Sequence, residues 1–284
     1  MLVRETIKTR LDNLALEIEE AFGADCLLFH GQIHPARLAV FGKAIQELHS
    51  TKQRLLIILQ TPGGSAEVTE KLVEIIRYFY QEVYFIVPRY AMSAGSIFCM
   101  SGDKIFMDYE SSLGPIDPQV YNGKDFVPAQ GYLDFYEKLV AKSSNGSISP
   151  GELQKLISTD LADLSRYEQA KNLTVTLLKK WLVQYKFKNW DTHRTNTELL
   201  GQPVTIQEKE QRAEQIARQL GDNSLWHSHG RFISASTLKN DIRLEIDDYP
   251  SLEVKNMILE YNDTAESHMS SCGVFNFFHT KKFF

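Results

Sequence analysis

Cysteine is scarce in this sequence of 284 residues, which contains only Cys26, Cys99 and Cys272. Because their number is odd and their spacings are wide, the sequence favours three reduced thiols over a disulfide framework. Long apolar runs are missing too, since none approaches the roughly 20 residues of a membrane-spanning helix. The acidic, amphipathic residues 1–22 lack the apolar core of a signal peptide. We therefore expect a cytoplasmic protein without a membrane span.

Basic residues are outnumbered by acidic ones: 31 Lys and Arg against 36 Asp and Glu give a formal net charge of −5. This balance argues against a general nucleic-acid binder. A basic stretch from Lys179 to Arg194 includes Trp181, Tyr185 and Trp190, which would suit a nucleic-acid patch, but a solvated helix face is the simpler interpretation. No nucleic-acid partner is predicted.

Histidine is also sparse, with eight in the chain and none between His49 and His193. A pair at His227 and His229 could be imagined to bind a metal together with His193. These three do not have a recognised ligand spacing, so no metal site and no other cofactor is predicted.

Short apolar strands alternate with amphipathic helices over the first 118 residues. The expected helices are residues 5–22, 35–48, 66–80 and 93–100, and the expected strands are residues 26–29, 55–59, 83–87 and 104–107. This alternation with short links predicts an α/β fold with right-handed crossovers and a mostly parallel sheet.

Beyond Pro118 the pattern becomes mainly helical. We expect a helix over 129–142 and one helical region from 152 to about 185. Capping boxes at 149–152 and 205–208 mark two helix starts. The final segment, GVFNFFHTKKFF, is aromatic and basic, and we interpret it as a docking or frayed tail.

A Thr-Pro-Gly-Gly segment at 61–64 directly follows the apolar strand expected at 55–59. Glycines there let the backbone turn sharply and leave N–H groups pointing into open space, where they can bind an anion. A tight β-α turn with no chemical role needs glycine as well, so this segment alone does not decide between the two.

Ser93 stands among small residues in Ala91-Met92-Ser93-Ala94-Gly95, just before an apolar helix. Small neighbours would let a substrate carbonyl approach, and the helix dipole would favour negative charge nearby. A serine at a helix start more commonly serves as an N-cap. The presence of the Gly63–Gly64 turn one helix and one strand earlier favours a nucleophile with an oxyanion-binding loop.

These segments resemble the ClpP/crotonase superfold in its peptidase branch: TPGG, then AMSAGS, then LGPIDPQ at 113–119. The most similar family is that of the serine dehydrogenase proteinases, whose members resemble the Clp protease proteolytic subunit and signal peptide peptidase A. The resemblance is clearest over 55–120 and weaker through 160–163 and 226–233. It implies stacked β-α-β units with a mostly parallel sheet and a helical C-terminal extension. It also implies serine endopeptidase activity on a peptide or protein substrate, and self-association into a homo-oligomer.

The resemblance assigns roles to individual residues. Ser93 corresponds to the nucleophile, and the backbone N–H groups of Ala94 and of either Gly63 or Gly64 correspond to the oxyanion hole.

The general base departs from the family pattern. Clp-type subunits carry a histidine in an IHQP-like segment, where this chain has Pro115-Ile116-Asp117-Pro118, and signal peptide peptidases use a lysine on a later helix. Lys138 lies in the corresponding region, as do Lys124 and Lys142, and burial could lower the pKa of a lysine enough for it to act as base. A surface position is the simpler interpretation for each lysine.

His229 could instead fold back as the base, because triad members are defined by geometry and not by chain order. A related family segment carries a similar Trp-x-His pattern. Asp117 could orient such a base. A loop histidine with ordinary hydrogen bonds, and an aspartate that fixes the Gly-Pro-Ile-Asp-Pro turn, remain the alternative interpretations.

The domains expected from these patterns are an N-terminal helix at 1–23, a ClpP/crotonase-like peptidase domain at 24–190 and a C-terminal extension at 191–284 packed on the core. Our leading hypothesis is a serine peptidase that acts through Ser93. A catalytically silent scaffold on the same fold is an alternative, motivated by the missing histidine. A crotonase-type acyl-CoA enzyme is another, although that branch does not use a serine in this setting.

Overall fold

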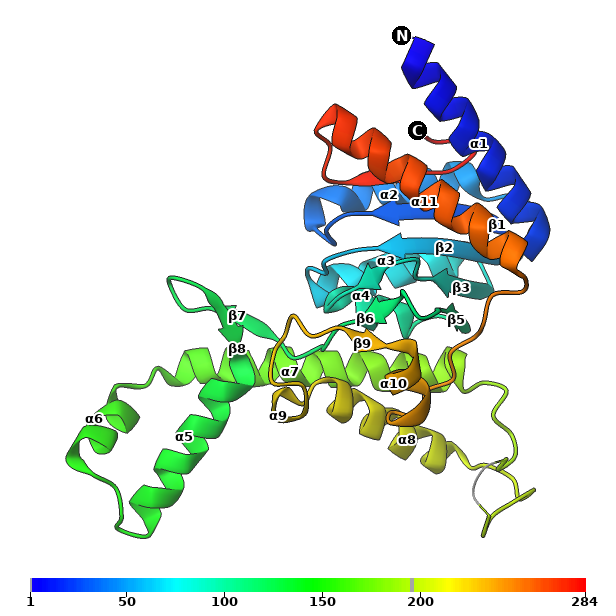
Figure 1. Ribbon diagram of the computed structural model, residues 1–284. Helices are drawn as coiled ribbons and strands as arrows, with labels where there is room; N and C mark the ends of the chain where they lie inside the picture. Colours follow the sequence, from blue (N-terminus) through cyan, green and yellow to red (C-terminus); the bar gives the residue numbers. More distant parts are fainter. Residues whose placement is uncertain (1, 195–196) are drawn as a thin grey trace.

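A five-stranded sheet in the order β10-β1-β2-β3-β5 forms the centre of the computed structural model, which describes residues 2–194 and 197–284 (Figure 1). Its strands are β1 (Asp25–His30), β2 (Arg54–Gln60), β3 (Glu82–Ile86), β5 (Lys104–Phe106) and β10 (Phe277–His279). Strands β1, β2, β3 and β5 are parallel, and β10 runs antiparallel to β1. The predicted α/β class with a mostly parallel sheet is confirmed.

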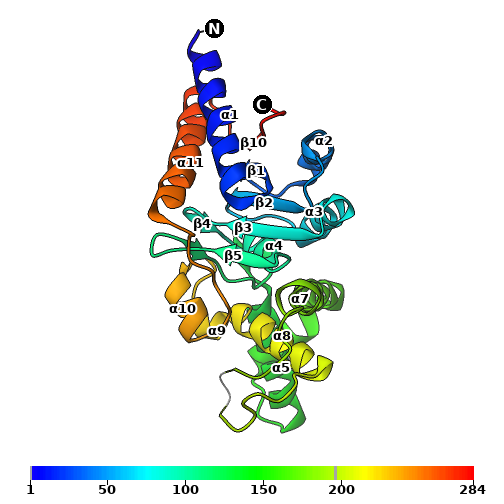
Figure 2. The ribbon, with the colours of Figure 1, turned by 90° about the vertical axis from the view of Figure 1, so that its right-hand side faces the viewer.

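Helices cover both faces of this sheet (Figure 2). One face carries α1 (Leu2–Phe22) and α11 (Leu252–Cys272), and the other carries α2 (Leu38–Leu48), α3 (Ala66–Phe79) and α7 (Leu161–Trp181). Because side chains alternate along a strand, Ile57 and Leu59 enter the core cluster on the α2–α3 side, and Leu56 and Ile58 enter the one beneath α1 and α11. Two covered faces explain why β2 is apolar throughout.

The C-terminal segment contributes a strand to the sheet. In β10, Phe278 lies opposite Phe29 of β1, with ring centroids 4.7 Å apart and edge to face. The aromatic and basic tail is therefore docked along the edge of β1 and covers groups that an open edge strand would expose.

A second, three-stranded sheet has the order β4-β6-β9. Its strands are β4 (Tyr90–Ala91), β6 (Ser112–Leu113) and β9 (Ile233–Ser234). A short helix, α4 (Ala94–Cys99), follows β4 and is entirely buried.

An arm extends from the body of the molecule (Figure 1). It consists of the hairpin β7 (Gln119–Tyr121) and β8 (Phe126–Pro128), followed by α5 (Ala129–Ser144) and α6 (Pro150–Ser158). The remaining elements are η1 (Pro35–Arg37), η2 (Leu182–Lys186), α8 (Ile206–Leu220), α9 (Asn223–Trp226) and α10 (Ala235–Asn240).

The helical region expected to run unbroken from 152 to about 185 is interrupted. Helix α6 ends at Ser158, and the Asp160 side chain accepts a hydrogen bond from the N–H of Ala162 to begin α7. The short side chains Ser158, Thr159 and Asp160 bond to nearby backbone and so favour a cap over a continued helix. At its far end α7 continues into η2, a π-helical turn.

Candidate active site

The Thr-Pro-Gly-Gly loop leaves the end of β2 and lies directly against the Ser93 segment. Thr61 pairs with that segment through two backbone hydrogen bonds, from its own N–H to Tyr90 O at 3.1 Å and from Met92 N–H to its carbonyl at 2.9 Å. Gly63 has φ +104°, and a Cβ at this position would lie 2.7 Å from Met92 O and 2.8 Å from Ser93 Cβ. Glycine is therefore required here by both backbone conformation and space.

Gly64, the second glycine, has φ +150° and packs against Ile33, whose carbonyl oxygen would lie 2.0 Å from a Cβ. The two glycines differ in their hydrogen bonds. The N–H of Gly63 donates to Thr61 Oγ1 at 3.0 Å. No acceptor for the N–H of Gly64 lies among residues 2–194 and 197–284.

Ser93 has φ 53° and ψ −118°, a backbone conformation that non-glycine residues rarely adopt. It stands at the N-terminus of α4, but its side chain makes no capping hydrogen bond. The hydroxyl is thus not used as the N-cap that its position would suggest. The following N–H, of Ala94, likewise has no acceptor in the described part of the chain. The half-buried Ser93 hydroxyl is therefore followed directly in the chain by the unbonded N–H of Ala94. The glycine turn, in which the Gly64 N–H also has no acceptor among the described residues, packs against the Ser93 segment through Gly63.

Asp117 and His229 form a hydrogen-bonded pair. The distance from His229 Nδ1 to Asp117 Oδ1 is 2.8 Å. The Asp117 side chain is 1% exposed, and its other oxygen accepts a hydrogen bond from Gln119 Nε2 at 2.8 Å. Because an ionised carboxylate only accepts hydrogen bonds, this contact places the imidazole proton on Nδ1 and leaves Nε2 as an acceptor.

The β4-β6-β9 sheet brings the segments of Ser93, Asp117 and His229 to one of its ends. Strands β4 and β6 are parallel, with Ala91 opposite Leu113, so the residues that follow them emerge at the same end. Strand β9 is antiparallel to β6, with Ile233 opposite Leu113, so the residues that precede β9 arrive at that end. Ser93 follows β4, Asp117 follows β6 and His229 precedes β9.

A hollow of about 220 Å³ lies at this end of the sheet. Its lining comes from three segments: Pro62 of the glycine loop, Tyr90 and Met92 next to Ser93, and His229, Gly230 and Phe232. The half-buried His229 therefore faces a space bounded by residues adjoining both Ser93 and the glycine turn. An acyl group could enter that space.

The structure does not bring Lys138 to this end of the sheet. Lys138 is exposed on α5 in the arm, and Lys124 is exposed in the turn between β7 and β8. Lys142 forms an ion pair with Glu152 in the first turn of α6. The other histidines considered also lie elsewhere: His193 contacts Glu208 at 3.2 Å, and His227 caps α9 with φ 63°. Among the described residues, no group of three or more metal-ligating side chains is placed to hold an ion.

Two residues of this site had no role in the sequence-based prediction. Thr61 orients the glycine turn through its hydroxyl, and Gln119 binds the second oxygen of Asp117. The TPGG and DPQ segments contain both residues, but nothing in their spacing indicates those hydrogen bonds.

The arrangement defines an α/β protein with a candidate serine-hydrolase site. Residues 42–223, more than half of the chain, match the family described as "ClpP-like SDH-type serine proteinase". The chain belongs to this family, and the resemblance noted in the sequence is confirmed.

Two relatives are the uncharacterized proteins MJ1495 and MJ0137 of Methanocaldococcus jannaschii. MJ1495 is 31% identical over 99 residues, which is 35% of this chain and 32% of the relative. MJ0137 is 29% identical over 153 residues, which is 54% of this chain and 49% of the relative. The matched part thus spans about a third and about half of the length of these relatives.

Similar solved structures include a point mutant of the 1510-N membrane-bound stomatin-specific protease, with 14% identity and a TM-score of 0.45 over 82% of this chain and 81% of the other. ClpP1 from Listeria monocytogenes has 12% identity and a TM-score of 0.41 over 89% of this chain and 98% of the other. Within the described residues of this chain, no helix has both the length and the apolar content to cross a membrane.

Proposed function

We propose that this protein is a serine peptidase that cleaves peptide bonds through an acyl-enzyme on Ser93. Membership in a serine proteinase family supports the class. The observation that carries the assignment is the hydrogen bond between the half-buried His229 and the buried Asp117, at the same end of the β4-β6-β9 sheet as Ser93. This contact supports His229 over Lys138 among the candidate bases that the sequence left open.

In the proposed reaction, Ser93 Oγ attacks the peptide carbonyl carbon while His229 Nε2 takes the hydroxyl proton. Asp117 holds the imidazole in the required tautomer and stabilises the imidazolium. The imidazolium then gives its proton to the leaving amine as the C–N bond breaks. Water attacks the remaining ester with the same base, which releases the acid and restores Ser93.

The oxyanion of each tetrahedral intermediate would be held by the N–H groups of Gly64 and Ala94, since neither has another acceptor among the described residues. The N–H of Gly63 already donates to Thr61. Gly63 instead provides the room that the Ser93 segment needs. Loss of one such donor typically costs on the order of 10²–10³ in rate.

Fluorophosphonate labelling followed by intact-mass spectrometry tests the proposal. The wild-type chain should gain one adduct on Ser93, and Ser93→Ala should gain none. His229→Ala should label at least about 10²-fold more slowly, because the base contributes on the order of 10²–10⁴. Lys138→Ala and His193→Ala are the matched controls and should label at the wild-type rate.

Two outcomes would contradict parts of this assignment. Loss of labelling in Lys138→Ala with full labelling of His229→Ala would identify a lysine base. Absence of any adduct on the folded wild-type chain would instead favour the catalytically silent scaffold.

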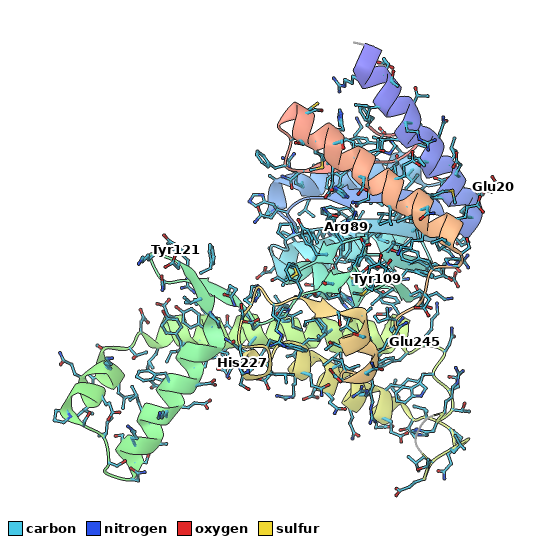
Figure 3. The ribbon with its side chains drawn as sticks, in the orientation of Figure 1. Glu20, Arg89, Tyr109, Tyr121, His227 and Glu245 are labelled. Atoms are coloured by element: carbon cyan, nitrogen blue, oxygen red, sulfur yellow. The ribbon has the colours of Figure 1, made fainter. Side chains whose placement is uncertain are left out.

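Self-association is part of this proposal, and exposed apolar side chains on the arm support it. Tyr121 and Phe126 of the hairpin are 59% and 72% exposed, and Ile157 of α6 is 76% exposed. Tyr121 lies on the hairpin, away from the central sheet (Figure 3). A second copy of the chain would cover this surface. Analytical ultracentrifugation should find an oligomer that Ile157→Glu reduces in size and Tyr78→Glu on α3 does not; a wild-type monomer would refute self-association.

A further inference from the structure

A second hollow, of about 640 Å³, is lined in part by Ile116 and Pro118, the two neighbours of Asp117 in the chain. It shares no lining residue with the hollow that His229 lines. Its volume falls within the range of about 300–1,000 Å³ that small-molecule sites occupy. Its walls come from the first turns of α5, the middle of α7, the end of α8 and the α9 turn. His227, on the α9 turn, lies where the arm meets the body (Figure 3).

The floor of this hollow is apolar. Ile116, Ala217 and Val175 line it, and the first two are buried at 3% and 0% exposure. Gly131 on α5 also lines it, and a Cβ added there would meet nothing within 4 Å. A ligand could therefore place an apolar group on this floor.

Some polar groups around the floor already have hydrogen-bond or ion-pair partners, and others do not. The Asp222 carboxylate is already bonded to the N–H and hydroxyl of Ser224, and Arg218 is paired with Glu214 at 2.7 Å. In contrast, the side chains of Lys171, His227 and Asn223 have no hydrogen-bond or ion-pair partner within the described residues. All three can donate hydrogen bonds, so the hollow presents free donors, one of them a cation, to an anionic acceptor.

Asp134, on the α5 wall, accepts one hydrogen bond from Gln130 and has further acceptor capacity. It could receive an amide N–H from the ligand. The hollow thus combines a cation, an amide acceptor and an apolar floor.

We propose that this hollow binds a carboxylate next to an amide and an apolar side chain, which is the chemistry of the C-terminal residue of a peptide or of a free N-acyl amino acid. Lys171 would pair with the carboxylate, and the apolar side chain would lie on Ile116 and Ala217. The proposal concerns binding alone and does not depend on catalysis by Ser93.

The experiment is equilibrium dialysis of radiolabelled N-acetyl-leucine against the full-length Ser93→Ala chain, which cannot turn a peptide over through Ser93. Saturable binding is expected, with N-acetyl-leucinamide at least about tenfold weaker because it lacks the charge. Lys171→Met should weaken acid binding about tenfold. Gly131→Trp should abolish it by filling the space, whereas Gly131→Ala should retain it. Thermal melts of each variant establish that it is folded.

The tetrapeptide Ala-Ala-Ala-Leu distinguishes the two ligand sources. Tighter binding than N-acetyl-leucine, still abolished by Gly131→Trp, would identify a peptide terminus, and equal binding would identify the small acid as sufficient. The proposal is overturned if no probe binds saturably, if acid and amide bind equally, or if binding survives both Gly131→Trp and Lys171→Met. None of these outcomes bears on fluorophosphonate labelling of Ser93.

Discussion

Replacement of Asp117 by asparagine is the sharpest perturbation of the proposed active site, because it changes the charge and hydrogen-bond polarity of a buried side chain at nearly constant size. The wild-type carboxylate accepts from His229 Nδ1 at 2.8 Å and from Gln119 Nε2 at 2.8 Å. In Asp117→Asn, the new amide NH₂ can donate to His229 Nδ1. The imidazole would then carry its proton on Nε2, where the base must be free to accept.

The expected decrease in the labelling rate of Asp117→Asn follows from the geometry of the pair. At an effective dielectric constant of about 20, two unit charges about 4 Å apart interact by about 4 kcal/mol, and Asp117 is almost fully shielded from water. Since about 1.4 kcal/mol corresponds to a factor of ten, removing the carboxylate should slow formation of the imidazolium about 10³-fold. The tautomer change adds to this, and the same substitution in the best-known triad costs on the order of 10⁴.

The assay is the second-order rate constant for fluorophosphonate labelling of Ser93, measured for the wild type, Asp117→Asn and the control Asp125→Asn. Asp125 is exposed in the β7–β8 turn and should be silent. Circular dichroism melts would confirm that both variants fold. Labelling of Asp117→Asn within about threefold of the wild-type rate would refute the reasoning and leave Asp117 as a residue that only fixes its turn.

Three further predictions concern stability. Gly63→Ala should lower the free energy of unfolding in urea by about 1–3 kcal/mol, because the added Cβ would overlap Met92 O. The control Gly131→Ala, at an open helix position, should raise it by up to about 1 kcal/mol. Equal effects of the two substitutions would contradict the close approach at Gly63. Phe278→Ala should lower the free energy of unfolding by about 3–5 kcal/mol, because the Phe278 ring is 5% exposed and packs on β1. Phe275→Ala, at a side chain that is 84% exposed, should leave it almost unchanged. No effect of Phe278→Ala would mean that β10 is not part of the folded core. Burial lowers the pKa of His279 from 6.5 to about 4, so the native state keeps it neutral while the unfolded chain is protonated below about pH 6.5. The free energy of unfolding should therefore be unaffected by this group above pH 6.5 and fall by at most about 3 kcal/mol between pH 6.5 and 4, with a shallower fall in His279→Gln; an unchanged slope in that variant would exclude the effect.

The base proposed for the reaction lies outside the part of the chain that matches the family. That match ends at residue 223, whereas His229 lies six residues further on. Its position depends on β9, which pairs with β6 across more than a hundred residues of sequence. A search for a histidine near the serine, or in the segment that follows it, therefore could not find this base.

Elements whose causes are local could be predicted from the amino-acid sequence. The apolar run of β2 followed by Pro-Gly-Gly, the stripe of α3 and the capping boxes of α6 and α8 each depend on residues within one turn or one strand of each other. The same local reasoning identified Ser93 and the glycine turn together as a candidate site. It also identified both members of the Asp117–His229 pair as candidates, but not their contact.

Local patterns gave an incomplete prediction where the structure depends on a distant segment. The C-terminal residues read as a docking or frayed tail, because nothing near them in sequence indicates that the edge of β1 is open to receive Phe278. Helix α11 was not predicted. Its buried side chains, which include Ile258, Tyr261 and Ala265, pack against α1 and the sheet, and these contacts cannot be inferred from the neighbouring residues in the chain.

The contacts that each candidate residue makes became visible only in the folded molecule. Ser93 could have capped α4 with its hydroxyl, but its strained backbone leaves that hydroxyl without a capping hydrogen bond. His229 could have been an ordinary loop residue, but the β4-β6-β9 pairing brings it to Asp117. The physical reason is the same in both cases. Propensity and periodicity act over a few residues, whereas the contact between His229 and Asp117 depends on strand pairings between segments far apart in the chain.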